Sequence, residues 1–186
     1  MSITANKNIN NNTKNNKEIE YDTLIIGGGI SGLTAALELA KADKKVLILD
    51  AQDKSKLGGL ARNAFGGMAL IGTPEQQRYG ITDNVEIALK DWLSFANFSK
   101  EDVFPKQWAK LYVERSYQDV YQYIKKLGIS FLPAVNWVER GLYSGGNSVP
   151  RYHVIWGTSL ELVNKILAAI APFKNKNIYF SFNRKV

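Results

Sequence analysis

The chain has 186 residues and a formal net charge of +7, with no cysteine and a single histidine, His153. The lack of cysteine excludes disulfides, thiolate metal sites and paired-cysteine redox chemistry, and one histidine excludes a histidine-based metal cluster within this chain. Three of the positive charges lie in the first 17 residues, and most others are scattered among acidic residues, so a solvated surface is a better interpretation than nucleic-acid binding. No run of 18 apolar residues occurs, so we predict no membrane span and expect a cytoplasmic protein.

The first 19 residues are rich in asparagine and lysine and contain few apolar side chains. Such a segment cannot bury enough surface to offset the entropy lost on ordering, so a disordered tail is predicted over residues 1–19. This segment also lacks the apolar core of a secretory signal. Residues 20–186 are enough for one domain.

Residues 21–50 read as a strand, a glycine-rich turn, a helix and a second strand. The apolar run 21–26 is followed by Gly-Gly-Gly-Ile-Ser-Gly at 27–32, and apolar residues then recur at helical spacing. A second apolar run, 46–49, ends in Asp50. A glycine motif alone is weak evidence, but these lengths and offsets together predict a dinucleotide-binding βαβ unit. The alternative is an ordinary glycine-rich turn of an α/β protein.

Each glycine of the turn has a predicted role. Gly27 lets the chain turn sharply out of the strand, Gly29 lets a pyrophosphate approach the backbone, and Gly32 lets the helix lie close to the sheet. If Gly29 faces a pyrophosphate, Gly29→Val is expected to abolish ligand uptake and Gly28→Ala to have a milder effect. The free N–H groups at the start of the helix are predicted to face phosphates, and Asp50 to accept hydrogen bonds from ribose hydroxyls.

Two Gly-Gly pairs, at 58–59 and 66–67, follow the second strand. Open α/β sheets bind their ligands at the carboxyl ends of the strands, so this glycine-rich loop is predicted to contact a ligand. A plain flexible loop is the alternative interpretation.

Two helices are predicted in the middle of the chain. The first covers 82–97 with a capping box between Asp83 and Glu86, and the second runs from Pro105, at its first position, to Leu127. A stacking platform is one interpretation of the aromatic residues in these helices, and core packing is the favoured one. These residues are Trp92, Trp108, Tyr112, Tyr117, Tyr121 and Tyr123.

The last third of the chain contains an irregular segment, 129–157, which is typical of a functional site when it occurs within a compact domain. Thr158 and Glu161 have the spacing that opens a further helix. Alternating apolar residues at 178–182 predict a third strand of the nucleotide-binding sheet.

Three motifs together resemble a known family. GGGISGL, the later GG…FGGM and NSVPRYHVIWGTS look like the fumarate reductase/succinate dehydrogenase superfamily of FAD-dependent oxidoreductases, in the FAD-binding dehydrogenase branch related to 3-ketosteroid dehydrogenases. The likeness runs from about residue 20 to residue 186. It implies an α/β fold: a Rossmann-like, three-layer FAD-binding domain around a parallel sheet, with a helical insertion and loop at 82–150.

The resemblance also implies what the chain lacks and what the family does. Family members transfer a hydride between the flavin N5 and a carbon next to a carbonyl or carboxylate. Against the family pattern, the chain is expected to be the N-terminal part of the FAD-binding domain, incomplete at its C-terminus. The capping domain and the C-terminal FAD segment would then be absent, and the chain is expected to be inactive alone.

Site residues follow by carrying the family motifs onto this sequence. The residues implied to bind FAD are Gly27, Gly29, Ser31, Gly32, Asp50, Gly58, Gly59, Gly66, Gly67 and Val186. Those implied to lie on the substrate side are Arg151, His153 and Thr158. Two alternatives stay open: Arg151 pairs with an acidic residue, or His153 is a structural hydrogen-bonding residue.

The expected cofactor is non-covalent FAD, because residues 50–70 hold no histidine or cysteine to which flavin is attached in some family members. The expected partners are a small-molecule substrate of the full-length form, steroid-like or dicarboxylate, and an electron donor or acceptor of unspecified kind. An NAD(P)-dependent dehydrogenase domain is one alternative, since the βαβ unit serves both cofactors, and the second glycine-rich loop favours FAD. A non-catalytic nucleotide-binding module is the other.

Overall fold

The computed structural model describes residues 19–132, 138–140 and 145–186, so nearly all of the predicted tail and part of the segment 129–157 lie outside the described residues. The described chain divides into two compact units. We call residues 19–62 and 166–186 the sheet unit, and the described residues between 63 and 165 the helical unit. Within the described residues, no helix has the length and apolar character needed to cross a membrane.

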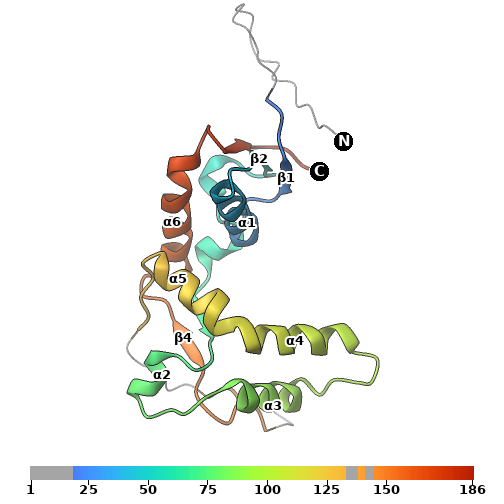
Figure 1. The fold of residues 1–186 in the computed structure, drawn as a ribbon, viewed down its shortest axis with the longest axis vertical. Helices are drawn as coiled ribbons and strands as arrows, with labels where there is room; N and C mark the ends of the chain where they lie inside the picture. Colours follow the sequence, from blue (N-terminus) through green and yellow to red (C-terminus); the bar gives the residue numbers. More distant parts are fainter. Residues whose placement is uncertain (1–18, 133–137, 141–144) are drawn as a thin grey trace, which may run out of the picture. The chain divides into compact units, whose positions relative to one another are not determined.

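The sheet unit is built on three parallel strands, β1 (Thr23–Ile26), β2 (Val46–Leu49) and β5 (Ile178–Ser181), in the order β1-β2-β5 (Figure 1). Ile48 of the central strand pairs with Ile25 on one side and with Phe180 on the other. These are the three strands that the apolar runs predict. The α/β class and the parallel sheet are therefore confirmed.

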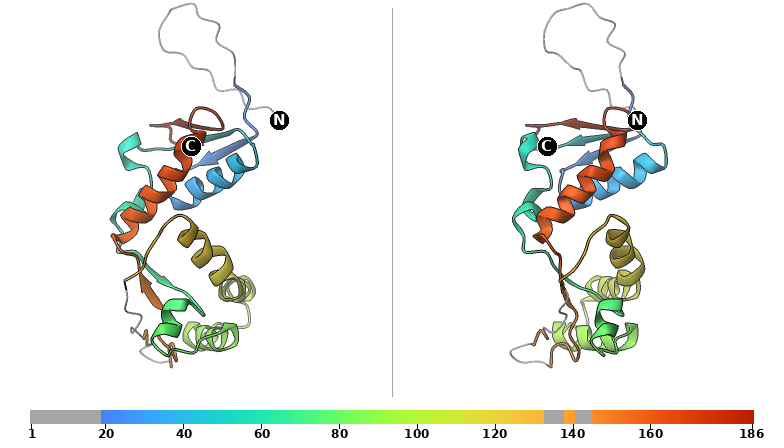
Figure 2. Two further views of the ribbon diagram at one scale, coloured as in Figure 1. Left: turned by 60° about the vertical axis from the view of Figure 1, so that its left-hand side comes forward. Right: turned by 90° about the vertical axis from the view of Figure 1, so that its left-hand side faces the viewer.

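Helix α1 (Ile30–Lys41) lies along the sheet in both views of Figure 2 and contacts all three strands. Its buried positions repeat at three- and four-residue spacing, as expected for one apolar face of a helix. They are Leu33, Ala36, Leu37 and Ala40. Together with the buried β2 residues Val46, Leu47 and Ile48, they form much of the core of this unit.

The turn between β1 and α1 requires glycine at two positions. Gly27 has φ +97°, a backbone conformation that side chains disfavour. A Cβ at Gly32 would overlap the carbonyl oxygen of Gly27 and lie 3.1 Å from Ile25 Cγ2. The close approach of helix to strand therefore depends on the missing side chain of Gly32.

The helical unit contains a short antiparallel pair, β3 (Gly67–Ala69) and β4 (Tyr152–Val154), in which Met68 lies opposite His153. The sequence analysis did not predict this pair. Strands of three residues are too short to show an alternating pattern, and their pairing is decided by segments more than 80 positions apart.

Four helices complete this unit: α2 (Pro74–Arg78), α3 (Val85–Ala96), α4 (Val103–Arg115) and α5 (Gln122–Lys126). Helices α3 and α4 lie side by side (Figure 1), and α4 continues through a π-helical turn, Ser116–Tyr121, into α5. The single helix predicted to end at Leu127 is thus interrupted in its hydrogen-bond pattern by a π turn.

Two predicted helix starts need correction. Asn84, not Asp83, caps α3, because its side-chain oxygen accepts a hydrogen bond from the Ile87 N–H at 2.9 Å. Helix α4 begins at Val103, which places Pro105 at the third helical position and not the first. Proline is tolerated there because the first turn has no intrahelical acceptors for its N–H groups.

The favoured core packing of the aromatic residues is wrong for Trp108, whose side chain is 69% exposed. At the α3–α4 contact, Ala88 and Val113 are buried beside Ile71, Leu89 and Tyr112 pack against them, and the rings of Trp92 and Tyr112 meet edge to face at 5.4 Å. Tyr121 is buried, as predicted. The 3.6-residue pattern does not tell which of two apolar stripes faces the neighbouring helix, and in α4 the stripe with Tyr112 and Val113 does so while Trp108 does not.

Helix α6 (Thr158–Ile170) starts where the sequence predicts and runs from the helical unit into the sheet unit. Its buried apolar residues are Leu162, Val163, Ile166 and Ile170. A 3₁₀ turn at Ala171–Phe173 ends it, and Asn175 adopts φ +59° before β5.

Candidate functional site

Asp50 ties the glycine turn to the end of β2. The Gly28 N–H donates to Asp50 Oδ2 at 2.6 Å, and the Gln52 N–H donates to Oδ1 at 2.7 Å. Each carboxylate oxygen has a second lone pair, so Asp50 still has capacity to accept hydrogen bonds from a ligand. A charge-assisted contact of this kind holds the turn and the carboxylate in one fixed geometry.

Gly28 is more constrained than expected. A Cβ at this position would lie 2.7 Å from Leu57 Cδ2 and 2.8 Å from Asp50 Oδ2. An alanine here would press on the carboxylate that the Gly28 N–H holds, and the smaller effect of Gly28→Ala than of Gly29→Val on FAD uptake stays a prediction.

The first turn of α1 presents unpaired N–H groups. Gly29 is the N-cap, no side chain caps the helix, and the first turn contains no acidic residue. A Cβ at Gly29 would meet no atom within 4 Å, and Ser31 is exposed. Open space above an uncapped helix N-terminus suits an anion, which the free N–H groups and the helix dipole both attract.

The first Gly-Gly pair lies against this turn. Gly58, with φ +98°, donates its N–H to the carbonyl oxygen of Gly28 at 2.8 Å. At Gly59, a Cβ would lie 3.5 Å from the Cα of Gly29. The loop after β2 therefore borders the candidate phosphate site, but the Gly58 N–H is already engaged and is not free for a phosphate, contrary to expectation.

The second Gly-Gly pair belongs to the helical unit, where contacts within that unit require glycine. A Cβ at Gly66 would lie 2.7 Å from the backbone nitrogen of Ser159, and one at Gly67 would overlap the phenol of Tyr152. Packing within the helical unit explains both glycines without a ligand.

The chain after β5 lies beside Asp50. The Arg184 N–H donates to the Asp50 carbonyl oxygen at 2.9 Å, and the Asn183 N–H donates to that of Gln52 at 3.1 Å. Val186, two residues further on, is 79% exposed. Thus Asp50 and the segment leading to Val186 are brought together at the carboxyl edge of the sheet.

Arg151 is buried in the helical unit and fully engaged. Its Nε and Nη2 donate to the two carboxylate oxygens of Asp83, each at 2.8 Å, and its Nη1 donates to Asp91 Oδ2 at 2.7 Å and Asn147 Oδ1 at 3.0 Å. The side chain is only 3% exposed. Pairing with acidic residues, the alternative left open above, is what the structure favours over a substrate-facing position.

Asp91 also fixes the segment that precedes Arg151, because Ser148 donates to it from its N–H at 2.8 Å and its hydroxyl at 2.7 Å. Burial alone raises the pKa of Asp91, but the hydrogen bonds from Ser148 and Arg151 outweigh burial and hold the pKa below its ordinary value. The sequence analysis missed this residue. The feature of the sequence that points to Asp91 is the position of its carboxylate, three residues after Ala88 on the buried face of α3.

His153 is completely buried, with both ring nitrogens engaged. Nδ1 lies 2.7 Å from the carbonyl oxygen of Arg151, and Nε2 lies 2.7 Å from the hydroxyl of Thr73. This arrangement favours the structural alternative for His153 over contact with a substrate. Thr158, by contrast, is exposed, with φ +65°, and its hydroxyl accepts the Leu160 N–H at 3.3 Å.

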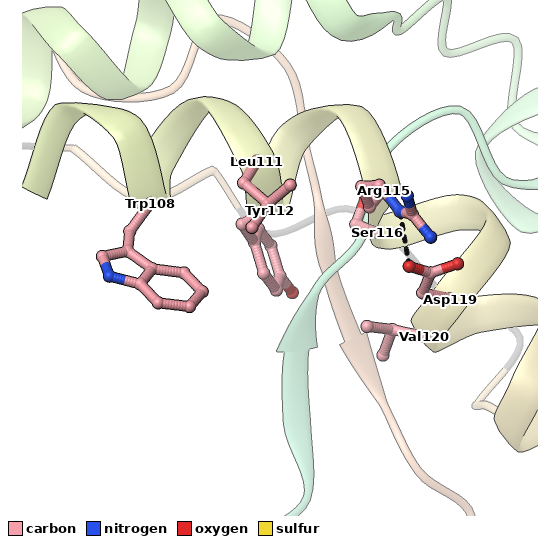
Figure 3. Close-up of a pocket in the computed structure, with 7 residues that line it drawn as sticks. All are labelled: Trp108, Leu111, Tyr112, Arg115, Ser116, Asp119 and Val120. Atoms are coloured by element: carbon pink, nitrogen blue, oxygen red, sulfur yellow. Dashed lines mark hydrogen bonds and ion pairs between the residues drawn. The ribbon is translucent and has the colours of Figure 1, made fainter. Parts of the chain in front are cut away.

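A hollow of about 370 Å³ opens on α4 and the π turn (Figure 3). Its wall is mostly apolar, with an ion pair between Arg115 and Asp119 on one side. The lining residues are Trp108, Leu111, Tyr112, Arg115, Ser116, Asp119 and Val120. No predicted cofactor or substrate residue lies in it.

The parallel sheet, the glycine turn at an uncapped helix and the carboxylate at the end of β2 define a dinucleotide-binding domain. The family described as FAD binding domain matches residues 22–178, and the chain belongs to this family.

Relatives and solved structures agree with that membership. A KsdD-like steroid dehydrogenase of Mycobacterium tuberculosis is 44% identical over 77% of this chain and 26% of its own length. One of Mycolicibacterium smegmatis is 41% identical over 77% of this chain and 27% of its own length. The chain thus spans about a quarter of the length of these relatives.

Two solved structures share the fold. The 3-ketosteroid-Δ4-(5α)-dehydrogenase of Rhodococcus jostii RHA1, in complex with 4-androstene-3,17-dione, has a TM-score of 0.70 and 22% identity over 88% of this chain and 38% of that one. An open flavocytochrome c3 fumarate reductase has a TM-score of 0.69 and 22% identity over 88% of this chain and 26% of that one. The chain is accordingly similar to FAD-dependent oxidoreductases of the steroid dehydrogenase and fumarate reductase type.

Proposed function

We propose that this chain is the nucleotide-binding part of an FAD-dependent dehydrogenase or reductase that transfers a hydride between the flavin and a carbon next to a carbonyl or carboxylate. The observation that carries the proposal is the uncapped α1 N-terminus at Gly29, with Asp50 held beside it through the Gly28 N–H. FAD supplies the hydride chemistry when it is bound. The residues of this chain bind and orient it.

We propose that different residues at the carboxyl edge of the sheet contact different parts of FAD. The first-turn N–H groups of α1, with Gly29 and the exposed Ser31 hydroxyl, bind the pyrophosphate. Asp50 accepts hydrogen bonds from the adenosine ribose, and the backbone near Val186 contacts adenine. Gly27, Gly32 and Gly59 give the backbone the shape that this approach requires. FAD is preferred to NAD(P) because the second glycine-rich loop begins against the same turn.

A steroid-like substrate is proposed for a protein that contains this chain, because the relatives that are more than 40% identical over 77% of the chain are KsdD-like steroid dehydrogenases. A dicarboxylate is the second proposal. It rests on the likeness of fold to a fumarate reductase. Thr158 is the substrate-side candidate that remains exposed. Arg151 and His153 support the fold of the helical unit from its interior.

Replacing Asp50 by alanine should weaken FAD binding about ten- to a hundredfold, because a charge-assisted hydrogen bond contributes about 1.5–3 kcal/mol. Fluorescence titration of the purified chain with FAD measures this. Asp53→Ala is the matched control: this exposed acid in the same loop caps only a 3₁₀ turn, through the Ser55 N–H.

Three results would contradict the assignment. They are an unchanged dissociation constant for Asp50→Ala, equal weakening by Asp53→Ala, and tight binding of ADP or NAD without any uptake of FAD. Circular dichroism melts of each variant separate lost binding from lost folding. Acid precipitation of the loaded chain should release all flavin into the supernatant, because we propose non-covalent attachment.

We also propose that this chain does not turn over substrate alone. It covers about a quarter of the length of its steroid dehydrogenase relatives, and hydride transfer needs a closed, water-excluding site around the flavin. Anaerobic addition of 4-androstene-3,17-dione to the FAD-loaded chain should leave the flavin absorbance unchanged. Substrate-dependent bleaching of the flavin bands by this chain alone would refute the proposal.

A further inference from the structure

Five residues of the helical unit, with buried side chains, form a closed ring of hydrogen bonds through side-chain and backbone groups, which we call the buried ring. His153 Nδ1 contacts the Arg151 carbonyl oxygen at 2.7 Å, and the Thr73 hydroxyl contacts His153 Nε2 at 2.7 Å. Gln76 Oε1 accepts the Thr73 N–H at 2.9 Å, and Gln76 Nε2 donates to Asp83 Oδ2 at 2.9 Å. Asp83 accepts from Arg151 Nε at 2.8 Å and closes the ring.

The ring fits one protonation state of His153. A carbonyl oxygen can only accept, so the Nδ1 atom carries the proton and donates it to Arg151. Nε2 of the neutral ring then accepts from the Thr73 hydroxyl. This assignment uses both nitrogens and leaves neither polar group of the buried imidazole unpaired.

The surroundings of His153 favour the neutral form. Burial lowers the pKa of His153 below its ordinary value of 6.5, and the Arg151 hydrogen bond and the carboxylates of Glu75 and Asp83 oppose the shift without cancelling it. The other charged groups nearby are the Arg151 guanidinium and Lys125, whose Nζ lies 3.8 Å from Glu75 Oε1. The edge of Phe131, an apolar ring, closes another side.

A second proton on His153 breaks this pattern. Nε2 then carries a proton and faces the Thr73 hydroxyl as a donor. The hydroxyl can therefore no longer donate its own proton to Nε2. The acceptor left for the hydroxyl proton is Gln76 Oε1 at 3.4 Å, a long contact to an atom that already accepts the Thr73 N–H. Protonation also places a positive charge where no solvent reaches it.

We propose that His153 is an acid-sensitive lock in the helical unit. The neutral side chain holds β4 against the N-cap of α2, and protonation opens the β3–β4 pair locally. The folded-state pKa is depressed, so the contribution of His153 to stability is fully present above the unfolded pKa near 6.5. It is lost progressively as the pH falls below that value. The proposal does not depend on FAD binding.

Hydrogen–deuterium exchange of the full chain at about pH 8 and pH 5.5 tests the lock. After correction for intrinsic rates, protection of peptides spanning β3 and β4 should fall relative to peptides spanning β1 and β2. The fall can reach about tenfold, since the unfolded histidine is about ten parts protonated to one at the lower pH, and it is smaller the closer the folded-state pKa lies to 6.5. In His153→Gln, whose amide oxygen accepts from Thr73 and does not titrate, the ratio of protection should not change with pH.

A second measurement uses the fact that His153 is the only histidine in the chain. On protein without a histidine tag, its imidazole NMR signals give the folded-state pKa with no assignment needed, even where His153→Gln fails to fold. We expect a value below 6.5. A folded-state pKa at or above 6.5 overturns the proposal, as does wild-type β3–β4 protection that does not change with pH, or a loss of the same size in a folded His153→Gln.

Discussion

Replacing Arg151 by methionine should lower the free energy of unfolding by about 3–5 kcal/mol, the cost of removing one partner from a buried ion pair. The guanidinium neutralises two carboxylates, those of Asp83 and Asp91, whose side chains are 0% and 10% exposed. Methionine fills similar space but leaves both carboxylates buried without the positive charge of the guanidinium. Urea unfolding of the helical unit, followed by tryptophan fluorescence, measures the loss.

The matched control is Arg115→Met, which removes an exposed ion pair with Asp119 on a helix surface and should have a much smaller effect. Adding Asp91→Asn to Arg151→Met should recover part of the lost stability, because it removes one uncompensated buried charge. Equal effects of the two arginine substitutions would show that Arg151 is not held as described.

Replacing Gly32 by alanine should destabilise the sheet unit by at least about 3 kcal/mol, the upper end of the usual cost of overpacking. The new Cβ would overlap the carbonyl oxygen of Gly27, a backbone atom that cannot turn aside as a side chain does. Helix α1 must therefore move away from β1. Thermal unfolding monitored by circular dichroism measures the change.

Gly29→Ala separates folding from ligand binding. Its Cβ meets no atom within 4 Å, and the backbone is extended, with φ −75° and ψ −178°, so stability should change little. FAD uptake should nevertheless fall, because the added methyl group occupies the space proposed for the pyrophosphate. A Gly32→Ala variant that is as stable as the wild type, or normal FAD uptake by Gly29→Ala, would show that the roles assigned to these glycines are wrong.

The sheet unit shows how much of the structure local sequence patterns can predict. The glycine turn and its carboxylate are close in sequence, since Gly27, Gly32 and Asp50 lie within one βαβ unit, and the apolar periods of the strands and helix are regular. Even here the pattern missed the constraint on Gly28, whose neighbours Asp50 and Leu57 come from other segments. A glycine requirement that arises from turn geometry is readable in sequence, but one that arises from a distant side chain is not.

The sequence by itself determined the α/β class, the parallel βαβ unit and the carboxylate at the end of β2, because these follow from periodicity and motif spacing. It determined the family through the resemblance of its motifs to those of known members. Only the tertiary structure decided that Arg151 and His153 are interior residues, since their partners Asp83, Asp91 and Thr73 are 60 to 80 positions away along the chain. The same residue types suit a substrate site or a buried polar network. Burial and the supply of matching donors and acceptors distinguish the two, and both depend on which distant segments the fold brings together.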